Sequence, residues 1–285
     1  MLSAIFSAGG KNFAFGPESA YVLSGADGIN SYTATDQREE YPHTDGYTPG
    51  EILYGERDLS LRGYIRAGSR EELPELRARL VRFCNGKQKG VLRCRRGAKA
   101  YFANALPYGV EFGEPMQNIQ TFAVQFSLYE FYWREYCEGL HSIYRREDLI
   151  NGTFTLPCPF TNRTSRSVLN NKGDIPIGCR VFIHCTAAGT GEENTITVHN
   201  HTTGAYTGIN HLPIAGETVI IDGGEYTVSS VIGETETNIL HHMTIDSSFP
   251  SLAVGDNDIE VICSDTSAAI TVEIEYYAAF VGVPL

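Results

Sequence analysis

The sequence offers few groupings of side chains that could do chemistry, and most of them concern metal binding. His199 and His201 lie two residues apart, so on a β-strand they point to the same face. Imidazole nitrogens at this spacing suit zinc, but no third ligand follows at a suitable spacing. His241 and His242 are adjacent, and adjacent residues of a strand point to opposite faces. We therefore predict no metal site and no cofactor.

Motifs for catalysis are also missing from the sequence. It holds no G-x-S-x-G turn, no H-E-x-x-H motif and no Walker loop, since Gly9-Gly10-Lys11 is followed by Asn12. Carboxylates that cleave a glycosidic bond can lie far apart along a chain, so a cell-wall hydrolase stays as an alternative. Glu273 and Glu275 fall on outward positions of a strand, where acids are usually solvated. We predict that the protein is not an enzyme and has no catalytic residues.

The seven cysteines favour free thiols over a disulfide framework. Their number is odd, their spacing is irregular, and no C-x-x-C pair occurs. The first ten residues lack the basic start and the long apolar run of an export signal, so a reducing cytosol is expected. We expect most of the thiols to pack as small apolar side chains.

Composition and charge exclude several classes of protein. With 42% apolar and 20% charged residues, the chain is expected to fold in water, and no apolar run approaches the roughly 20 residues of a membrane-spanning helix. Residues 1–150 hold 18 Lys/Arg against 19 Asp/Glu, a net charge of −1, and residues 151–285 hold 4 against 15, a net charge of −11. The acidic half repels nucleic acids and anionic membranes. This asymmetry predicts two domains with different tasks.

The N-terminal half predicts strands around one helix. Residues 57–66 alternate apolar and polar side chains, which indicates a half-buried strand. A capping box at 69–72 and a stop at Asn85-Gly86 bracket a helix whose apolar residues recur at helical spacing. A strand pair is expected on either side of a basic turn at 93–99. The long strand 121–133 changes parity near residues 129–130, which predicts a β-bulge there.

The C-terminal half predicts a β-sandwich. The hairpin 218–228 turns at Asp222-Gly223-Gly224, which is a strong turn signal. Short strands at close spacing with no helix between them are typical of a sandwich. The other predicted strands are 181–185, 195–199, 258–263 and 269–276. We place the two domains at 1–140 and 141–285, with a turn-like connector at about 136–167.

Residues 24–55 have no clean period and are rich in tyrosine. A loop of this length inside a compact domain is usually functional or is ordered by a partner. Because tyrosines are favoured interface anchors, we interpret this segment as an arm that contacts another subunit. The predicted contact residues are Tyr41, Tyr47, Ile52, Leu53 and Tyr54.

Taken in order, several segments resemble the siphophage distal tail protein family, which is a phage tail-component family. The helix ending in Phe83-Cys-Asn-Gly-Lys and the strand Phe126-Ser-Leu-Tyr-Glu-Phe-Tyr-Trp133 resemble its N-terminal domain. Phe154-Thr-Leu-Pro-Cys-Pro-Phe160 resembles its connector. Asn170-Asn-Lys-Gly-Asp174 and Ser248-Phe-Pro-Ser-Leu resemble segments of its C-terminal domain. The collinear order of these motifs carries the resemblance.

The resemblance implies a mainly β protein, with an N-terminal, β-barrel-like, ring-forming domain that has one helix and a C-terminal galectin-like β-sandwich. It implies a structural hub of a phage tail tip or baseplate. Six copies would form a ring that joins the tail tube protein and the tape-measure protein to the tail-associated hub protein and the receptor-binding protein. DNA would pass through the ring without specific binding, and no membrane is involved. Assembly would occur in the bacterial cytoplasm, and the protein would act in the virion at the tail tip.

Two further readings concern individual side chains. Arg93, Arg95 and Arg96 are predicted to face solvent or a protein partner rather than DNA, because stacking aromatics are not interleaved with them. The alternative function is a carbohydrate-binding adhesion module of a phage tail, in which exposed tyrosines of the sandwich hold a cell-wall glycan. The tyrosines in question are Tyr206, Tyr226, Tyr276 and Tyr277.

Overall fold

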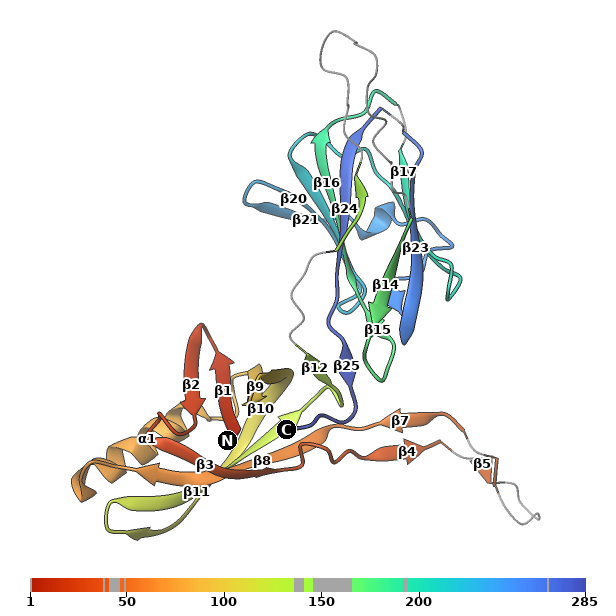
Figure 1. Ribbon diagram of the computed structural model, residues 1–285. Helices are drawn as coiled ribbons and strands as arrows, with labels where there is room; N and C mark the ends of the chain where they lie inside the picture. The colour runs from red at the N-terminus through yellow and green to blue at the C-terminus, as the bar shows by residue number, and fades with distance from the viewer. Residues whose placement is uncertain are drawn as a thin grey trace. The chain divides into compact units, whose positions relative to one another are not determined.

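The computed structural model describes residues 2–37, 39–40, 47–48, 50–135, 141–145, 166–191, 194–265 and 267–285 (Figure 1). It divides into two compact units. The N-terminal unit comprises Met1–Tyr136 together with Phe280–Leu285, and the C-terminal unit comprises Cys137–Ala279. The predicted second domain ran to residue 285, whereas the last six residues lie with the first unit. Strands dominate both units, as predicted, and no helix among the described residues is long and apolar enough to cross a membrane.

One large antiparallel sheet forms the N-terminal unit. Its strands follow the order β2-β1-β9-β10-β11-β8-β3, and β12 and β25 pair beside β10. Phe13 on β2 and Tyr21 on β3 have ring centroids 4.7 Å apart, so side chains from the two ends of this order meet. The sheet is therefore barrel-like. Its strands are β1 Leu2–Ala8, β2 Lys11–Phe15, β3 Tyr21–Asp27, β8 Arg57–Arg66, β9 Gly90–Arg96, β10 Lys99–Met116, β11 Ile119–Leu128, β12 Trp133–Glu135 and β25 Ala279–Phe280.

Alternating apolar residues supply the core of this unit. On β8, Leu59, Leu61 and Ile65 are buried while their neighbours are more exposed, as the period of two predicts. The even-numbered residues of β11 from Phe122 to Leu128 are buried in the same way. Aromatic rings fill the centre, and the Phe6 and Phe126 rings meet edge to face at 5.2 Å.

One α-helix, α1 Leu73–Phe83, follows a short 3-10 turn η1 Arg70–Glu72 and covers the core with the buried Leu73 and Leu80. The predicted capping box is wrong in detail, because the Ser69 side chain caps nothing. Instead, the Glu72 carboxylate accepts a hydrogen bond of 2.8 Å from the Gly68 amide, and the helix proper begins beside Pro74.

The predicted strand 121–133 is in fact two strands. β11 ends at Leu128, and the chain bends before Trp133 starts β12. β11 pairs with β8 and β10, whereas β12 pairs with β10 and β25. The change of parity therefore marks a bend between strands, and the register shifts of this region fall instead between the β10–β11 partners, near Pro107 and Phe112.

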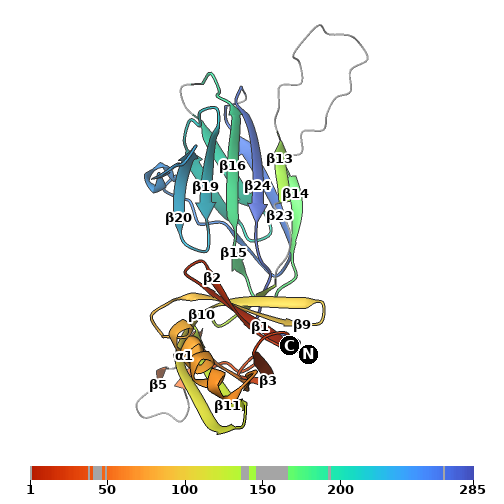
Figure 2. The same ribbon diagram turned by 90° about the vertical axis from the view of Figure 1, so that its left-hand side faces the viewer.

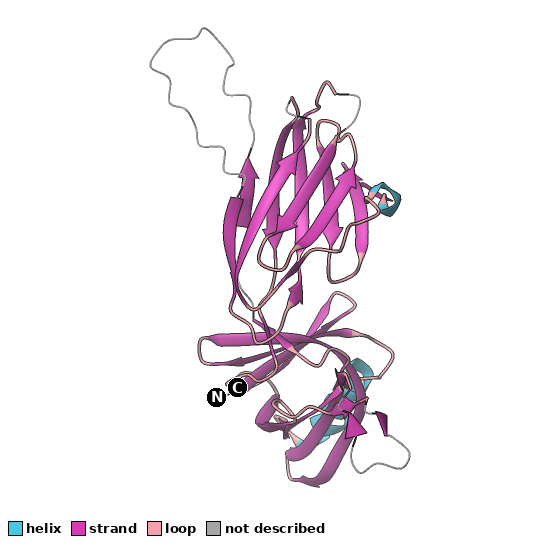
Figure 3. Ribbon diagram, turned by 90° about the vertical axis from the view of Figure 1, so that its right-hand side faces the viewer, coloured by secondary structure: helices cyan, strands magenta, loops and turns pink. Residues whose placement is uncertain are grey.

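The C-terminal unit is a sandwich of a six-stranded and a four-stranded antiparallel sheet (Figures 2 and 3). The first has the order β13-β24-β16-β19-β20-β21 and the second β14-β23-β17-β18. Their inward residues, such as Ile183 and Val272 from one sheet and Val198 and Val261 from the other, form one core.

The predicted strands 181–185, 195–199, 258–263 and 269–276 lie within or overlap β16, β17, β23 and β24, whereas β13, β14, β18 and β21 were not predicted. The six-stranded sheet contains β13 His141–Arg145, β16 Arg180–Ala187, β19 Glu217–Asp222, β20 Thr227–Ile232, β21 Thr235–Asn238 and β24 Ala269–Glu275. The four-stranded sheet contains β14 Arg166–Asn171, β17 Thr195–Asn200, β18 Ala205–Asn210 and β23 Gly255–Cys263. A small pair, β15 Ile177–Gly178 and β22 Ser251–Leu252, and a 3-10 turn, η2 Leu240–His242, complete the described elements.

The described cysteines are free thiols, as the sequence predicts. Burial raises the pKa of Cys84, Cys94 and Cys179 to about 12, so these thiols stay protonated and pack as apolar groups. Cys137 and Cys158 lie outside the described residues.

Candidate functional site

The described residues of the segment 28–56, here called the arm, extend from the end of the β3–β8 strand pair (Figure 1). The arm contains two small two-stranded ladders, one of β4 Ala34–Asp36 with β7 Ile52–Tyr54 and one of β5 Glu39–Glu40 with β6 Tyr47–Thr48. A two-stranded ribbon is marginally stable by itself in water. An arm of this kind therefore suits a segment that gains its stability from a partner surface.

The predicted contact residues map onto this arm. Ile52, Leu53 and Tyr54 are successive residues of β7, and their side chains are 60%, 43% and 41% exposed. Because successive strand residues point to opposite faces, both faces of β7 offer apolar side chains to solvent. Tyr47 lies on β6, and Tyr41 lies outside the described residues.

The base of the arm is fixed by aromatic contacts that the sequence analysis missed. The Tyr54 ring stacks on Phe131 with centroids 4.3 Å apart and planes at 15°, and Tyr32 meets Tyr54 edge to face at 5.4 Å. The Gly55 amide donates to the Thr33 carbonyl at 2.9 Å. Phe131 follows β11 in sequence, and only the bend between β11 and β12 brings it to the arm.

A buried arginine fastens the root of the arm. Arg57, the first residue of β8, is 1% exposed, and its guanidinium donates to the carbonyls of Ile29 and Val281. Trp133 donates from Nε1 to the same Ile29 carbonyl at 2.9 Å. Burial lowers the pKa of Arg57. The arm thus starts from a rigid point.

The C-terminal residues of the chain complete this root. Asn30 donates from Nδ2 to the Val283 carbonyl at 3.0 Å, and the Val283 amide donates back to Asn30 Oδ1 at 2.8 Å. The Val283 side chain is buried in the core of the unit. Residues more than 250 positions apart are therefore held side by side at the point where the arm leaves the sheet.

The basic residues of the predicted strand pair lie on β9. Arg93, Arg95 and Arg96 are exposed, and the turn between β9 and β10 is narrower than predicted, at Gly97-Ala98. Arg95 donates from Nε to the Gly97 carbonyl at 2.9 Å. Their orientation toward solvent or a partner stays a prediction.

A groove over the ends of β1, β2 and β9 does not assemble acid–base chemistry from the residues that the structure describes. It has a volume of about 610 Å³ and lies over residues of these strands and the turn that follows β2. Its lining contains one carboxylate, Glu18, and one cation, Arg95, but no histidine or cysteine. Paired carboxylates, which glycoside hydrolysis requires, are not present in it.

The tyrosines of the glycan alternative lie on three different elements of the C-terminal unit. Tyr206 lies on β18, Tyr226 in the turn after β19, and Tyr276 and Tyr277 follow β24. The Tyr276 hydroxyl donates to the Asn170 carbonyl at 2.8 Å, and the Tyr277 hydroxyl donates to Glu275 at 3.0 Å. Tyr226 is 66% exposed and packs against Phe249.

The structure supplies the third metal-ligand candidate that the sequence analysis did not find. Glu260 on β23 faces His199 on β17 in the strand register, and its carboxylate lies 2.7 Å from His201 Nε2. Glu260 was missed because its nearness depends on the pairing of two strands about 60 residues apart. The sequence placed Glu260 only within the predicted strand 258–263.

Two family models match the chain, one in each unit. Residues 18–128 match the phage tail protein RIFT-related domain, and residues 173–280 match the C-terminal domain of the siphovirus-type tail component. Together the two matches cover most of the chain. No curated protein matches the sequence.

Solved structures share the fold over nearly the whole chain. The Dit protein (gp 19.1) of phage SPP1, described as a paradigm of the hub adsorption apparatus of phages infecting Gram-positive bacteria, aligns with a TM-score of 0.66 at 10% identity, covering 96% of this chain and 98% of that chain. The phage P2 baseplate in its activated conformation with Ca aligns with a TM-score of 0.57 at 12% identity, covering 96% of this chain and 97% of that chain. The same baseplate in its activated conformation with Sr aligns with a TM-score of 0.55 at 12% identity, covering 97% of this chain and 99% of that chain. At these identities, the likeness establishes the fold.

Proposed function

Because the chain belongs to the siphovirus-type tail component family, we propose that it is a structural hub of a phage tail tip, six copies of which form a ring. The protein is a structural component of a phage tail, and its fold is that of tail hub and baseplate proteins. The ring would join the tail tube and tape-measure proteins on one side to the tail-associated hub and receptor-binding proteins on the other. DNA would pass through it without specific contacts.

The arm, residues 28–56, is the observation that carries this proposal. It exposes Ile52 and Leu53 on opposite faces of β7, and its base is held by Arg57 and by the Tyr54–Phe131 stack. A rigidly rooted ribbon with apolar side chains is suited to lie across the same surface of every neighbouring copy. Contacts of this head-to-tail kind close into a ring when their rotation permits.

The mass of the purified protein in solution tests the ring directly. We expect a particle of six times the 31.4 kDa chain mass, and an annulus with a central hole in electron micrographs. A particle of one chain mass at every concentration measured would contradict the proposal.

Two substitutions test the arm within that experiment. Ile52→Asp and Leu53→Lys each place a charge on the exposed ribbon, and we expect each to weaken a subunit contact by about 1–2 kcal/mol, or roughly tenfold. Both side chains are exposed in the single chain, so its thermal unfolding should change little. Ile245→Asp, at a fully exposed isoleucine of the C-terminal unit, is the matched control. Rings that persist in both arm variants would exclude the arm as the contact.

Carbohydrate binding by the C-terminal unit is the second candidate function, and Tyr226, which is 66% exposed, favours it. Its ring meets the half-buried Phe249 edge to face at 5.3 Å, so a single aromatic platform is open to a sugar face. The other three tyrosines of this alternative are only partly exposed. Retention of the protein on host cell-wall polysaccharide, lost in Tyr226→Ala, would support this role. Equal retention of the variant would exclude this platform.

A further inference from the structure

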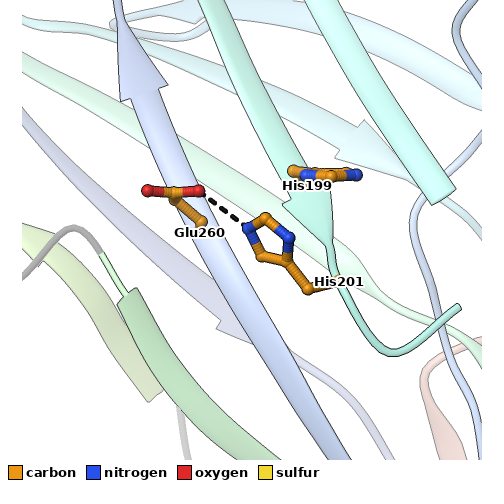
Figure 4. Close-up of side chains that lie close together, drawn as sticks. All are labelled: His199, His201 and Glu260. Atoms are coloured by element: carbon orange, nitrogen blue, oxygen red, sulfur yellow. Dashed lines mark hydrogen bonds and ion pairs between the residues drawn. The ribbon is translucent and has the colours of Figure 1, made fainter. Parts of the chain in front are cut away.

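We propose that His199, His201 and Glu260 bind a divalent transition-metal ion of the zinc class on the outer face of the four-stranded sheet (Figure 4). Figure 4 shows the two imidazoles and the carboxylate turned toward one another from β17, the residues after it, and β23. One ligand atom from each residue lies within 4.8 Å of the other two. The three residues belong to the C-terminal unit, whereas the arm belongs to the N-terminal unit.

The geometry requires only a small adjustment to accept an ion. Zinc bonds of about 2.0–2.2 Å in tetrahedral arrangement separate neighbouring ligand atoms by roughly 3.3–3.6 Å. His201 Nε2 and Glu260 Oε2 are 2.7 Å apart, and the rings of His199 and His201 have centroids 4.2 Å apart with planes at 62°. Side-chain rotations can therefore bring all three donors to bonding distance.

The backbone holds the three residues in place. His199 and Glu260 are direct partners in the antiparallel register of β17 and β23. His201 lies just beyond the end of β17, and its amide donates to the Asp258 carbonyl at 2.9 Å. Two of the three residues thus lie on paired strands, which position a site more precisely than a loop does, so only side chains need to rotate when an ion binds.

Asn200 fixes the turn that carries His201. Its buried side chain donates from Nδ2 to Asn257 Oδ1 at 3.0 Å and to the Ser251 carbonyl at 3.1 Å. Its Oδ1 accepts a hydrogen bond of 3.1 Å from the Thr202 amide. The direction in which His201 leaves the strand is thus set by groups on both sides of it.

Charge around the site favours a cation. Arg166 is the other register partner of Glu260, on β14, and on its own would repel a metal ion. Its guanidinium is instead paired with Asp258, whose Oδ1 accepts from Arg166 Nε at 2.6 Å. The Asp258 carboxylate offsets the positive charge of Arg166, so the Glu260 carboxylate is available to a metal ion together with the two histidines.

The donor set selects the class of ion. Two imidazoles and one carboxylate suit zinc, copper or nickel, whereas Ca²⁺ and Mg²⁺ prefer oxygen ligands throughout. Three protein ligands leave a fourth position for water or for a donor atom of another molecule. The bound ion would also cross-link β17 and β23, so it would stabilise the C-terminal unit by mass action.

Cobalt titration of the metal-free, full-length protein tests the site, because Co²⁺ substitutes for Zn²⁺ and has a visible spectrum. We expect one equivalent to give the spectrum of a low-coordinate site with nitrogen and oxygen ligands, which Zn²⁺ then displaces. His199→Ala, His201→Ala and Glu260→Gln should each weaken this binding at least about tenfold, since even changes beyond the ligands cost 10–100-fold. In the wild type, Zn²⁺ should raise the midpoint of thermal unfolding, and in Glu260→Gln it should not.

His184 and Glu273 provide the matched control. His184 Nε2 lies 3.3 Å from Glu273 Oε2 on the six-stranded sheet, so this pair repeats the histidine–carboxylate contact, with Phe182 stacked beside the imidazole. His184→Ala should bind cobalt as the wild type does. The proposal is overturned if no cobalt binds, if the spectrum shows thiolate ligands, or if the three site variants bind as tightly as His184→Ala.

Discussion

Glu217 is a carboxylate that the fold removes from solvent and then surrounds with hydrogen-bond donors. It is 3% exposed and accepts hydrogen bonds from the Ser230 hydroxyl, the Ile214 amide at 2.8 Å and His211 Nε2 at 2.6 Å. Burial by itself raises the pKa of Glu217, but these donors outweigh it and hold the pKa below its ordinary value of 4.5. The charged form is therefore the one that the fold stabilises.

This arrangement predicts acid sensitivity of the C-terminal unit. A lowered pKa in the folded state means that Glu217 contributes stability above pH 4.5 and loses it as the pH falls through its folded-state pKa. We expect the free energy of unfolding to fall below pH 4.5 and the fall to be shallower in Glu217→Gln. Urea unfolding at several pH values measures this pH dependence of the free energy of unfolding. Glu236→Gln, at an exposed position of β21, is the control. An identical pH dependence in Glu217→Gln and the wild type would contradict this assignment.

Single residues also show where sequence reasoning reaches its limit. The sequence identified His199 and His201 as a same-face pair, since a period of two is local. It could not identify Glu260, because the pairing of β17 with β23 is a long-range choice of the fold. Arg57 is the first residue of the predicted strand 57–66, and its burial follows from carbonyls that the arm root and the C-terminus bring to it.

At the scale of elements, the root of the arm depends on one short segment at the C-terminus. Val281 supplies a carbonyl to Arg57, and Val283 pairs with Asn30. Arg57 therefore links β8 to two other segments through one hydrogen bond to each. Hydrogen bonds to a charged group contribute about 1.5–3 kcal/mol each.

We predict that Arg57→Met lowers the free energy of unfolding of the N-terminal unit by about 2–4 kcal/mol. Truncation after Phe280 should also destabilise this unit, and the two changes should be non-additive by at least about 0.5 kcal/mol, because they remove the same hydrogen bond. Urea unfolding followed by the fluorescence of Trp133, the single tryptophan, reports on this unit alone. Arg66→Met, at the exposed end of the same strand, is the control. If the effects of Arg57→Met and of the truncation were additive, the coupling between them would be refuted.

Strands with a clean alternation were predicted from the sequence, and strands that bend were not. The hairpin β19–β20 and the buried face of β11 follow from turn chemistry and from the period of two. The break between β11 and β12 looked like a bulge, because a change of parity does not say whether the chain stays with the same partner strand. The ladders of the arm were not predicted because they are only two or three residues long.

At the scale of the whole molecule, the C-terminal unit is an insertion within the N-terminal unit. The chain leaves the first unit after Tyr136 and returns to it at Phe280. Each unit has its own hydrophobic core, so each meets the main requirement for folding alone.

Two fragments test this division. Residues 137–279 should unfold cooperatively on their own, as monitored by circular dichroism. Residues 1–136 joined to 280–285 by a short Gly/Ser linker should keep the wild-type Trp133 fluorescence, because β12 and β25 are neighbouring strands. The fragment 1–136 without residues 280–285 should be less stable. Equal stability with and without them would show that the returning segment adds nothing.

The insertion also bears on survival outside the cell. If a protease cut the chain once between β13 and β14, the two fragments would still be held together, because β13 pairs with β24 and β12 pairs with β25. A single cut would thus not by itself release a fragment from the particle.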